Sequence, residues 1–596
     1  MAEQPLCDVV FADRYAMPAE TSRQQLFDRV AQALALAEPA ATREPVARQF
    51  VRNLRHGAFG AGRIMANAGG PPNQTMVNCF VHPVAAPASA PHEAPDLDRA
   101  LDEARLTLSM GGGVGYDFSD IPPATALRDS GATSERGVCA AIDRFDRMCS
   151  EVGATGTRRG AQMAVLRCDH PDLLAFVGAK RGRSRWPTFN LSVAVTDAFM
   201  NAVADDQPWT LRHRAPPPGA SGSPPAAPDG RQDYATLPAR RIWHEIVTQA
   251  RDSAEPGLLF IDTINAANPL RFRETLAATN PCGEQPLPPY GSCVLGPIDL
   301  SRLVRHPFGV DGEPRFDFSA LAAAVEIQVR LLDNVLDLTH WPLAAHAREA
   351  RATRRIGVGV TALGDALTMM KLRYDAPAAR ELAGRIARHM RDHAYAASAR
   401  LAGERGAYPC CDPAVHLDGR TGAPPLPGAV RAAIERAGLR NSHLLSFAPT
   451  GSVSIAFGGN CSNGVEPAYD WICQRKVRLG DGETHSLRAE NRAHRRFREL
   501  CGDRTPLPDY FTRAVDVAPP DHVAMLAALQ PYVDAAISKT VTVGSACTLS
   551  QIDALFFTAW RSKLKGVTVF RPDASLDAVL VAVEAGACAS SPCVNC

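Results

Sequence analysis

The residues best suited to chemistry in this chain lie close together, in the sixteen-residue segment 278–293. Asn280, Cys282 and Glu284 supply an amide, a thiol and a carboxylate at alternate positions, and Cys293 adds a second thiol. Alternate side chains of an extended segment share one face, so we expect the first three groups to point the same way. A thiol beside a hydrogen-bonding amide and a general base, with a further thiol as reductant, suits radical chemistry on a substrate that carries hydroxyl groups. The simpler alternative is a proline-rich loop in which the cysteines are incidental.

The composition limits the partners that the chain can have. With 596 residues, of which 46% are hydrophobic, the chain can bury a large core in one big domain or in several smaller ones. The net charge of +1 gives no overall field that would recruit nucleic acid or an anionic membrane, so an anionic ligand needs a local site. The N-terminus has no basic segment followed by an apolar one, and no apolar run approaches the length of a bilayer span. These features predict a cytoplasmic protein without a membrane segment.

Sixteen cysteines in a cytoplasmic chain are expected to be buried thiols, redox thiols or metal ligands rather than structural disulfides. The last residues, Cys593-Val-Asn-Cys596, have the spacing of a zinc half-site or of a redox dithiol. Zinc needs four ligands and only Cys588 lies near in sequence, so we predict no metal site. A chain end is suited to a mobile redox shuttle, and an incidental tail is the alternative.

Periodicity predicts helices and strands that interleave, which favours an α/β fold. Residues 21–55 have helical spacing after a Thr21-Ser22 cap, so the chain is expected to open with a small helical unit. The segment 215–230, rich in proline and glycine, reads as a flexible surface insertion. Further helices are expected near 97–110, 242–251, 318–338 and 377–401, and strands near 114–118, 163–167 and 189–195.

A series of motifs in the order of one family accompanies the segment around Cys282. They are Gly62–Ala66, Val77–Phe80, Gly111–Phe118, Arg158–Met163, Leu166–Pro171, Asn190–Val193 and Ala448–Ser452. With residues 280–290 they make the chain resemble the adenosylcobalamin-dependent class II ribonucleotide reductases, from about residue 62 to 572. The resemblance implies an α/β barrel of two half-sheets with a central finger loop. It also implies three parts: an N-terminal helical unit, 1–61; a catalytic barrel, 62–572, containing the insertion; and a flexible tail, 573–596, with redox cysteines.

The resemblance also implies roles for the thiols. Cys282 would become a thiyl radical and remove the 3' hydrogen of a ribonucleotide, while Glu284 would take the 3' hydroxyl proton and Asn280 would hold the ribose hydroxyls. Cys79 and Cys293 would supply two electrons and form a disulfide at each turnover. The tail pair, Cys593 and Cys596, would carry electrons to it from thioredoxin or glutaredoxin.

Two further segments are implied to bind the substrate. One is the phosphate loop, with Pro449, Thr450, Gly451, Ser452 and Val453. The other is Gly111, Gly112 and Gly113, together with Asn78. Gly111–Gly113 is not a Walker loop, because no Gly-Lys-Ser/Thr follows it.

The radical source is chosen by elimination. The iron-dependent reductases receive a radical from a second subunit through a tyrosine pair, whereas residues 555–560 and 566–572 contain phenylalanines and no tyrosine. No glycyl-radical segment is present either. Adenosylcobalamin remains, with no separate radical-generating subunit, and without an Asp-x-His-x-x-Gly motif a protein histidine of that type is not expected on the cobalt. The predicted reaction is reduction of ribonucleotides, with diphosphates expected and triphosphates left open; a non-catalytic nucleotide-binding paralogue is the competing hypothesis.

Regulation is less determined by the sequence. Residues 134–139 carry a charged pair, Glu135-Arg136, where the family has small residues, which puts allostery in doubt. The cations Lys180, Arg181, Arg183 and Arg185 would either meet an effector phosphate or be solvated. Deoxynucleoside triphosphates and ATP are the candidate effectors, and the chain is expected to be a monomer or a homodimer.

Overall fold

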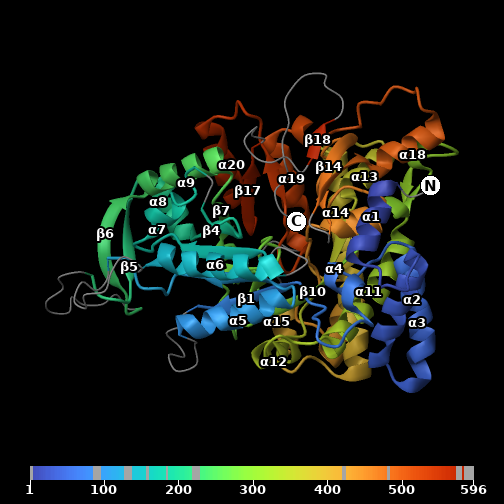
Figure 1. Cartoon of the computed structure of the whole chain (residues 1–596), viewed down its shortest axis with the longest axis horizontal. Coiled ribbons are helices and arrows are strands. Elements are labelled where there is room, and N and C mark those ends of the chain that lie inside the picture. Colours follow the sequence, from blue (N-terminus) through green and yellow to red (C-terminus); the bar gives the residue numbers. More distant parts are fainter. Residues whose placement is uncertain are drawn as a thin grey trace.

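The computed structural model describes residues 4–84, 96–125, 137–155, 160–182, 185–217, 229–418, 424–479, 483–571 and 580–582. An N-terminal group of helices lies at one side of a barrel, and a two-stranded hairpin projects at the opposite side (Figure 1). The predicted α/β class is therefore confirmed.

Three helices form the N-terminal unit: α1 (Pro5–Arg14), α2 (Arg23–Leu34) and α3 (Ala40–Arg55). Ser22 begins α2 with a capping box in which Gln25 is the partner, as the Thr21-Ser22 signal predicted. Their apolar faces meet one another and the barrel, burying residues such as Leu26, Val30 and Phe50 completely.

The barrel is built from two groups of parallel strands. The strand order is β13-β10-β1-β2-β3-β4-β7-β17-β16, with antiparallel contacts only where β1 meets β10 and where β7 meets β17. Segment 444–447 closes the ring, because it bonds to β13 on one side and to residues 535–538, which lead into β16, on the other. The strands within each half therefore run parallel to one another, and the two halves run antiparallel to each other. This arrangement confirms the predicted barrel of two half-sheets.

The strands of the ring have the following bounds: β1 (Cys79–Pro83), β2 (Gly113–Asp117), β3 (Gln162–Arg167), β4 (Phe189–Val195), β7 (Gly257–Phe260), β10 (Ser292–Asp299), β13 (Ile356–Thr361), β16 (Thr540–Thr542) and β17 (Gly566–Phe570). The larger helices outside it are α5 (Leu97–Ser109), α6 (Val138–Thr155), α8 (Asp197–Ala204), α9 (Ala239–Ser253), α11 (Phe318–Leu338), α12 (Ala344–Thr353), α14 (Pro377–Arg405), α16 (Gly428–Ala437), α18 (Arg492–Cys501), α19 (Pro519–Leu529) and α20 (Leu549–Arg561). Each helix and strand expected from periodicity is present, within a few residues of its expected ends.

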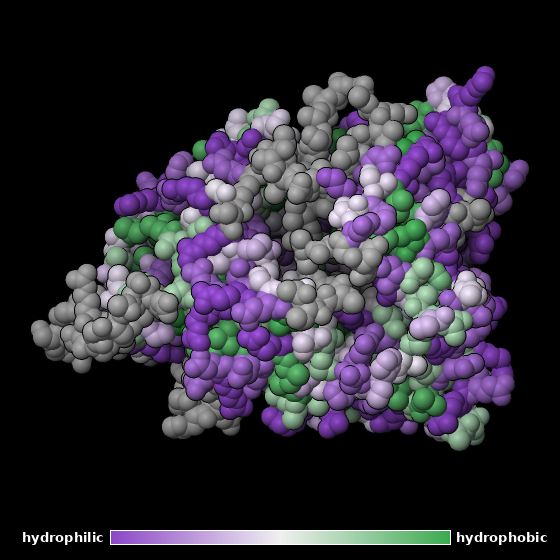
Figure 2. Space-filling model, viewed as in Figure 1, coloured by the Kyte–Doolittle hydropathy of each residue, from purple (hydrophilic) through white to green (hydrophobic). Residues whose placement is uncertain are grey.

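The proline-rich insertion is bracketed by β5 (Pro208–His213) and β6 (Gln232–Pro238), which pair as the projecting hairpin in Figure 1. Residues 215–217 and 229–230 lie in no helix or strand, as expected, and residues 218–228 lie outside the described part of the chain. The surface drawn in Figure 2 is mostly hydrophilic, with apolar side chains in small scattered groups. Among the described helices, none combines the length and the apolar character that crossing a membrane requires.

Buried charges join the N-terminal unit to the barrel. Glu38, which is 3% exposed, follows α2 and accepts hydrogen bonds from Asn334 (2.9 Å) and Arg330 (3.0 Å) of α11, while Arg405 of α14 lies 2.5 Å away. Burial by itself would raise the pKa of Glu38, but the contacts with Arg405 and Asn334 outweigh it and hold that pKa below its ordinary value. The ionised carboxylate is therefore the form that the folded protein stabilises.

Replacing this carboxylate should weaken the whole fold. We expect Glu38→Gln to lower the free energy of unfolding at pH 7 by about 3 kcal/mol, because it removes a buried negative charge that faces both Arg330 and Arg405. The difference in the free energy of unfolding between this variant and the parent chain should be largest above about pH 4.5. It should shrink as the pH falls through the lowered pKa of Glu38 in the folded state. Denaturant titrations at pH 7 and pH 4 measure both effects. Glu44→Gln, which removes an exposed partner of Arg48 on α3, is the control and should cost less than about 0.5 kcal/mol.

Candidate active site

The finger loop enters the barrel between β8 (Ala278–Thr279) and β9 (Pro286–Leu287). It touches both halves of the ring: Asn190 of β4 donates to the Pro281 carbonyl at 2.9 Å, and the Glu284 carbonyl accepts from the Ala536 N–H at 2.9 Å. An apolar cluster separate from the main core surrounds it inside the barrel: Cys79, Val81, Met163, Val165, Ala194, Leu259, Ile264, Leu276, Ala278, Leu287, Cys293 and Leu295.

Three of the predicted catalytic side chains meet in this interior. The Asn280 amide donates to Cys79 Sγ at 3.3 Å, and the Cys79 thiol lies 3.8 Å from Glu284 Oε1. Asn280 Oδ1 accepts a hydrogen bond from the Gln285 N–H at 2.9 Å, so both the nitrogen and the oxygen of the amide are hydrogen-bonded. Asn280 and Glu284 are each 2% exposed and Cys79 is 4% exposed. The amide, the carboxyl and one thiol of the proposed reducing pair therefore form a single buried group.

The second thiol of that pair lies on the neighbouring strand. Cys79 of β1 is directly opposite Cys293 of β10 in the antiparallel register. Directly opposed residues have Cα atoms about 4.5–5.5 Å apart, within the range that a disulfide spans. Both side chains belong to the interior cluster, so they face the same side of the sheet. The two cysteines are 214 positions apart in sequence, and the fold places them where they can form a disulfide with each other.

Burial changes the acidity of these groups. It raises the pKa of Glu284 to about 7, although hydrogen bonds with its own backbone, with Asn280 and with Cys79 oppose the rise. Burial also raises the pKa of Cys79 well above its usual value, with the charge of Glu284 adding to the effect, and it raises the pKa of Cys293. Both thiols are therefore protonated at neutral pH, while Glu284 is divided between its acid and its base form. Glu284 Oε2 has no hydrogen-bond partner among the described residues, which leaves this oxygen for a ligand.

Cys282 has a different environment. The extended geometry expected for residues 280–284 is wrong: the chain turns here, with the Gly283 N–H donating to the Asn280 carbonyl at 3.1 Å. As a result Cys282 is exposed at the tip, whereas Asn280 and Glu284 are buried. Gly283 permits the turn through a φ of +82°, and a Cβ built on it would meet nothing within 4 Å. The position beside Gly283 is therefore open, next to the exposed Cys282.

The predicted phosphate loop leads into α17 (Gly451–Ala456). Gly451 needs a φ of +44°, and Pro449 precedes the turn. Thr450 contacts Thr361 through their hydroxyls at 2.7 Å, and its oxygen also accepts from the Gly464 N–H. Ser452 contacts the phenol of Tyr15 at 2.5 Å, and Val453 is buried.

The second predicted binding segment lies against the finger loop. Gly113 donates to the Asn78 carbonyl at 2.7 Å, and a Cβ on Gly113 would stand 3.1 Å from Pro281. Arg63, at the start of α4 (Gly62–Asn67), donates through Nε to the Gly111 carbonyl at 3.0 Å, and its N–H donates to Asn78 Oδ1 at 3.3 Å. Gly111 has a φ of +88°, which favours glycine, and a Cβ there would stand 2.3 Å from the Arg63 guanidinium carbon. The absence of a side chain at Gly112 leaves room for the Phe80 ring.

Known proteins match the chain over nearly its whole length. Residues 77–570 match the family described as "Ribonucleotide reductase, barrel domain", and residues 4–72 match "Ribonucleotide reductase, all-alpha domain". The chain belongs to the ribonucleotide reductase family. The domain boundaries expected at 61/62 and at 572/573 stay predictions.

Several curated reductases are similar to this one. A "Vitamin B12-dependent ribonucleoside-diphosphate reductase" of Mycobacterium tuberculosis is 34% identical over 94% of this chain and 77% of its own length. A protein of the same name from Thermoplasma acidophilum is 31% identical over 85% of this chain and 62% of its own length. A "Ribonucleoside-diphosphate reductase large subunit" of Caenorhabditis elegans is 24% identical over 82% of this chain and 66% of its own length.

The structure brings together most, but not all, of the residues predicted for this reductase. Cys593, Cys596 and residues 134–136 lie outside the described residues. So does Arg183, while the other cations of its segment pair with carboxylates: Lys180 with Glu255, Arg181 with Glu245, and Arg185 with Asp143. Sequence reasoning missed Tyr15 altogether, and it cited the 62–66 motif without giving Arg63 a role.

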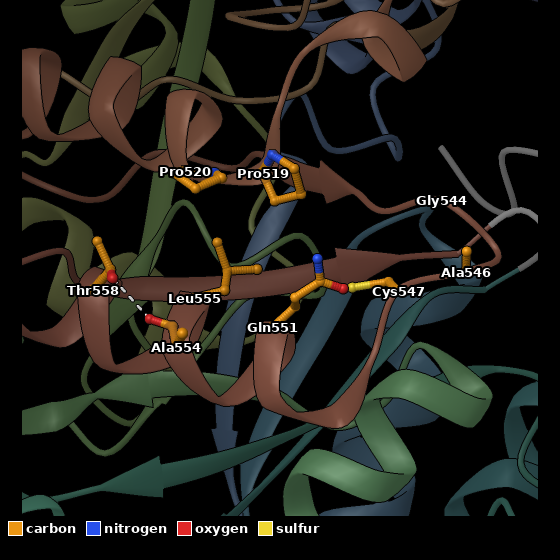
Figure 3. Close-up of a pocket in the computed structure, with 9 residues that line it drawn as sticks. All are labelled: Pro519, Pro520, Gly544, Ala546, Cys547, Gln551, Ala554, Leu555 and Thr558. Atoms are coloured by element: carbon orange, nitrogen blue, oxygen red, sulfur yellow. Dashed lines mark hydrogen bonds between the residues drawn. The ribbon is translucent and has the colours of Figure 1, made fainter.

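A pocket of about 390 Å³ lies elsewhere in the reductase, between the start of α19, residues 544–547 and α20 (Figure 3). Pro519, Pro520 and Leu555 make much of its wall apolar, and Cys547 and Gln551 also line it. None of its lining residues belongs to the predicted site. Across the ranges that the structure describes, no group of three or more His, Cys, Asp or Glu could hold a metal ion.

The register of β1 and β10 gives a direct test. Mild oxidation of the resting reductase with diamide should join Cys79 to Cys293, because opposed strand positions already bring the sulfurs within disulfide reach. Peptide mapping by mass spectrometry should find the cross-linked pair in the parent chain and in Cys461→Ser, a buried thiol elsewhere, but not in Cys293→Ser. Failure to cross-link the two residues, with other pairs joined instead, would contradict the assigned geometry.

Proposed function

We propose that this chain reduces ribonucleoside diphosphates to 2'-deoxyribonucleoside diphosphates, with adenosylcobalamin as its radical source. The observation that carries the proposal is the opposed pair of buried thiols, Cys79 and Cys293, beside a carboxyl whose pKa is near 7. Replacing the 2' hydroxyl by hydrogen, with loss of water, needs two electrons and two protons, and a dithiol that becomes a disulfide can supply both. The names of the relatives at 31–34% identity agree with the substrate class and with the cofactor.

Each residue has one step in the proposed reaction. The Cys282 sulfur takes the 3' hydrogen atom of the ribose and returns it at the end, since it lies at the exposed tip of the loop. Glu284 Oε2 takes the 3' hydroxyl proton and returns it at the end, while one thiol proton of the Cys79–Cys293 pair goes to the 2' oxygen, which leaves as water. Asn280 orients the site through its amide, which in this structure donates to Cys79. Cys79 and Cys293 then give up two electrons and two protons and become a disulfide.

Two segments would hold the substrate. Thr450, Gly451 and Ser452 would bind its phosphates, and the Gly111–Gly113 backbone with Asn78 would lie against its sugar. Arg63 would add a positive charge beside this second segment, where its guanidinium already donates to Gly111. An anionic substrate needs such a local charge, because the net charge of the whole chain is only +1.

The space beside the finger loop suits a bulky radical source. Cys282 is exposed and Gly283 faces open space, so these two residues would lie against bound adenosylcobalamin. When bound, that cofactor supplies a radical that can remove the hydrogen of the Cys282 thiol. The tyrosine route of the iron-dependent reductases is not favoured, because α20 and β17 carry phenylalanines, among them buried Phe556, and no tyrosine.

The disulfide must be reduced again after each cycle. We propose thioredoxin or glutaredoxin as the external dithiol, with Cys593 and Cys596 as the internal carriers. Thiol–disulfide exchange needs no metal, so this tail pair could pass electrons directly to the disulfide in the barrel. Effector binding by deoxynucleoside triphosphates or ATP and the choice between monomer and homodimer stay predictions.

The first test of the function is its dependence on the cofactor and on Cys282. The isolated chain, given a ribonucleoside diphosphate, adenosylcobalamin and a dithiol, should form deoxynucleotide without iron and without a second protein. Cys282→Ser should bind the nucleotide with about the same affinity yet form no product, because an O–H bond is too strong for reversible hydrogen transfer. Product from that variant, or product that needs a diiron partner, would overturn the proposal; nucleotide binding without any turnover would favour a non-catalytic paralogue.

The pKa of Glu284 predicts the pH dependence of turnover. Its pKa is raised to about 7, and the base form is the active one, so kcat/KM should rise with pH up to about 7 and level off above it. Glu284→Gln should lower turnover by about 10²–10⁴-fold and abolish this rise. Asp365→Asn, which removes another buried carboxyl whose pKa is raised, to about 6, should keep it. A rise that survives in Glu284→Gln would assign the base to another group.

A further inference from the structure

Tyr15 of the N-terminal unit reaches the proposed phosphate loop. It follows α1 directly, is 4% exposed, and its phenol oxygen lies 2.5 Å from Ser452 Oγ, 437 positions further along the chain. A Cβ built on Gly62 would stand 3.5 Å from the same phenol oxygen. Gly62 precedes Arg63, which contacts Gly111. The phenol therefore lies between Ser452 of the phosphate loop and Gly62, the neighbour of Arg63.

The N-terminal unit holds this phenol in place. The Tyr15 ring packs edge-on against Phe457, with ring centroids 4.9 Å apart, and Arg29 of α2 donates to the Tyr15 carbonyl at 3.3 Å. Arg23 of α2 donates to the Ala456 carbonyl at 2.6 Å, at the far end of α17. Three further rings, those of Phe11, Phe27 and Phe59, surround Phe457. The N-terminal unit thus contacts α17 at both ends.

The Thr450 and Ser452 hydroxyls of the loop differ in which acceptor their proton can reach. Thr361 donates to the Ser462 carbonyl at 3.0 Å, so the Thr450 hydroxyl has two acceptors inside the protein, Thr361 at 2.7 Å and Asn463 Oδ1 at 3.4 Å. Either oxygen of the Tyr15–Ser452 pair could donate, and we assign the phenol as the donor to Ser452 Oγ because it is a stronger acid than an aliphatic alcohol. Ser452 then keeps its own proton for an acceptor outside the protein. Of the two loop hydroxyls, Ser452 is the one equipped to donate to an anion.

We propose that Tyr15 is a positioning residue for the substrate phosphates. By donating to Ser452 it fixes the rotamer of that serine and directs the remaining hydroxyl proton toward a phosphate oxygen. The N-terminal unit is then part of the binding site for a nucleoside diphosphate and not only a support of the barrel. This inference rests on the proposed function, in which residues 449–453 bind the phosphates.

The test is a double-mutant cycle on the full chain. Tyr15→Phe keeps the ring and removes only the hydroxyl, so it should raise the Kd of a ribonucleoside diphosphate about fivefold, as expected for one neutral hydrogen bond, and leave kcat within about twofold. Ser452→Ala should raise the Kd about tenfold. In the Ser452→Ala background, Tyr15→Phe should have no further effect, because its only route to the phosphate is already gone. Calorimetric titration gives the Kd values.

Tyr408→Phe is the matched control. It removes another buried phenol, which contacts His416 at 2.9 Å, and should lower the melting temperature without changing the Kd. An unchanged Kd in Tyr15→Phe while Ser452→Ala weakens binding would overturn this inference and spare the phosphate loop. Equal weakening by Tyr15→Phe in both backgrounds would make Tyr15 merely structural. An unchanged Kd in Ser452→Ala would instead overturn the phosphate loop of the proposed function, and the inference with it.

Discussion

The close approach of two backbones inside the barrel is the constraint on which the site depends. A Cβ on Gly115 of β2 would stand 1.7 Å from the Thr279 carbonyl oxygen, so only glycine lets the finger loop lie against this strand. The loop then reaches both half-sheets, through Asn190 on one side and Ala536 on the other. With its entry fixed in this way, the loop holds Asn280 and Glu284 beside Cys79, and Cys282 at the open tip.

Burial sets the pKa values of these groups, and it also lowers the stability of the fold. Taking Glu284 out of water raises its pKa to about 7 and leaves Oε2 without a partner among the described residues, which costs stability whenever the carboxylate ionises. The same burial keeps the Cys79 thiol protonated. The rest of the molecule offsets such costs with a large core and with buried ion pairs such as those of Glu38.

Much of the fold could be predicted because it depends on local patterns. The cap at Ser22, the helix at 318–338 and the strand at 189–195 follow from spacing that needs no knowledge of the rest of the chain. The same reasoning failed at residues 280–284, where strand alternation was expected and Gly283 instead turns the chain. Tyr15 could not have been found, since nothing in its local sequence indicates a partner 437 positions away.

The sequence by itself determined the chemical inventory: a thiol near an amide and a carboxylate, a second and a third thiol, and motifs in the order of one family. The tertiary structure decided which of these groups are buried and which face open space. It set Cys79 opposite Cys293, raised the pKa of Glu284, and brought the N-terminal unit to Ser452. The physical reason is that acidity, disulfide reach and hydroxyl orientation depend on distance and on exclusion of water, and only the packed chain fixes either.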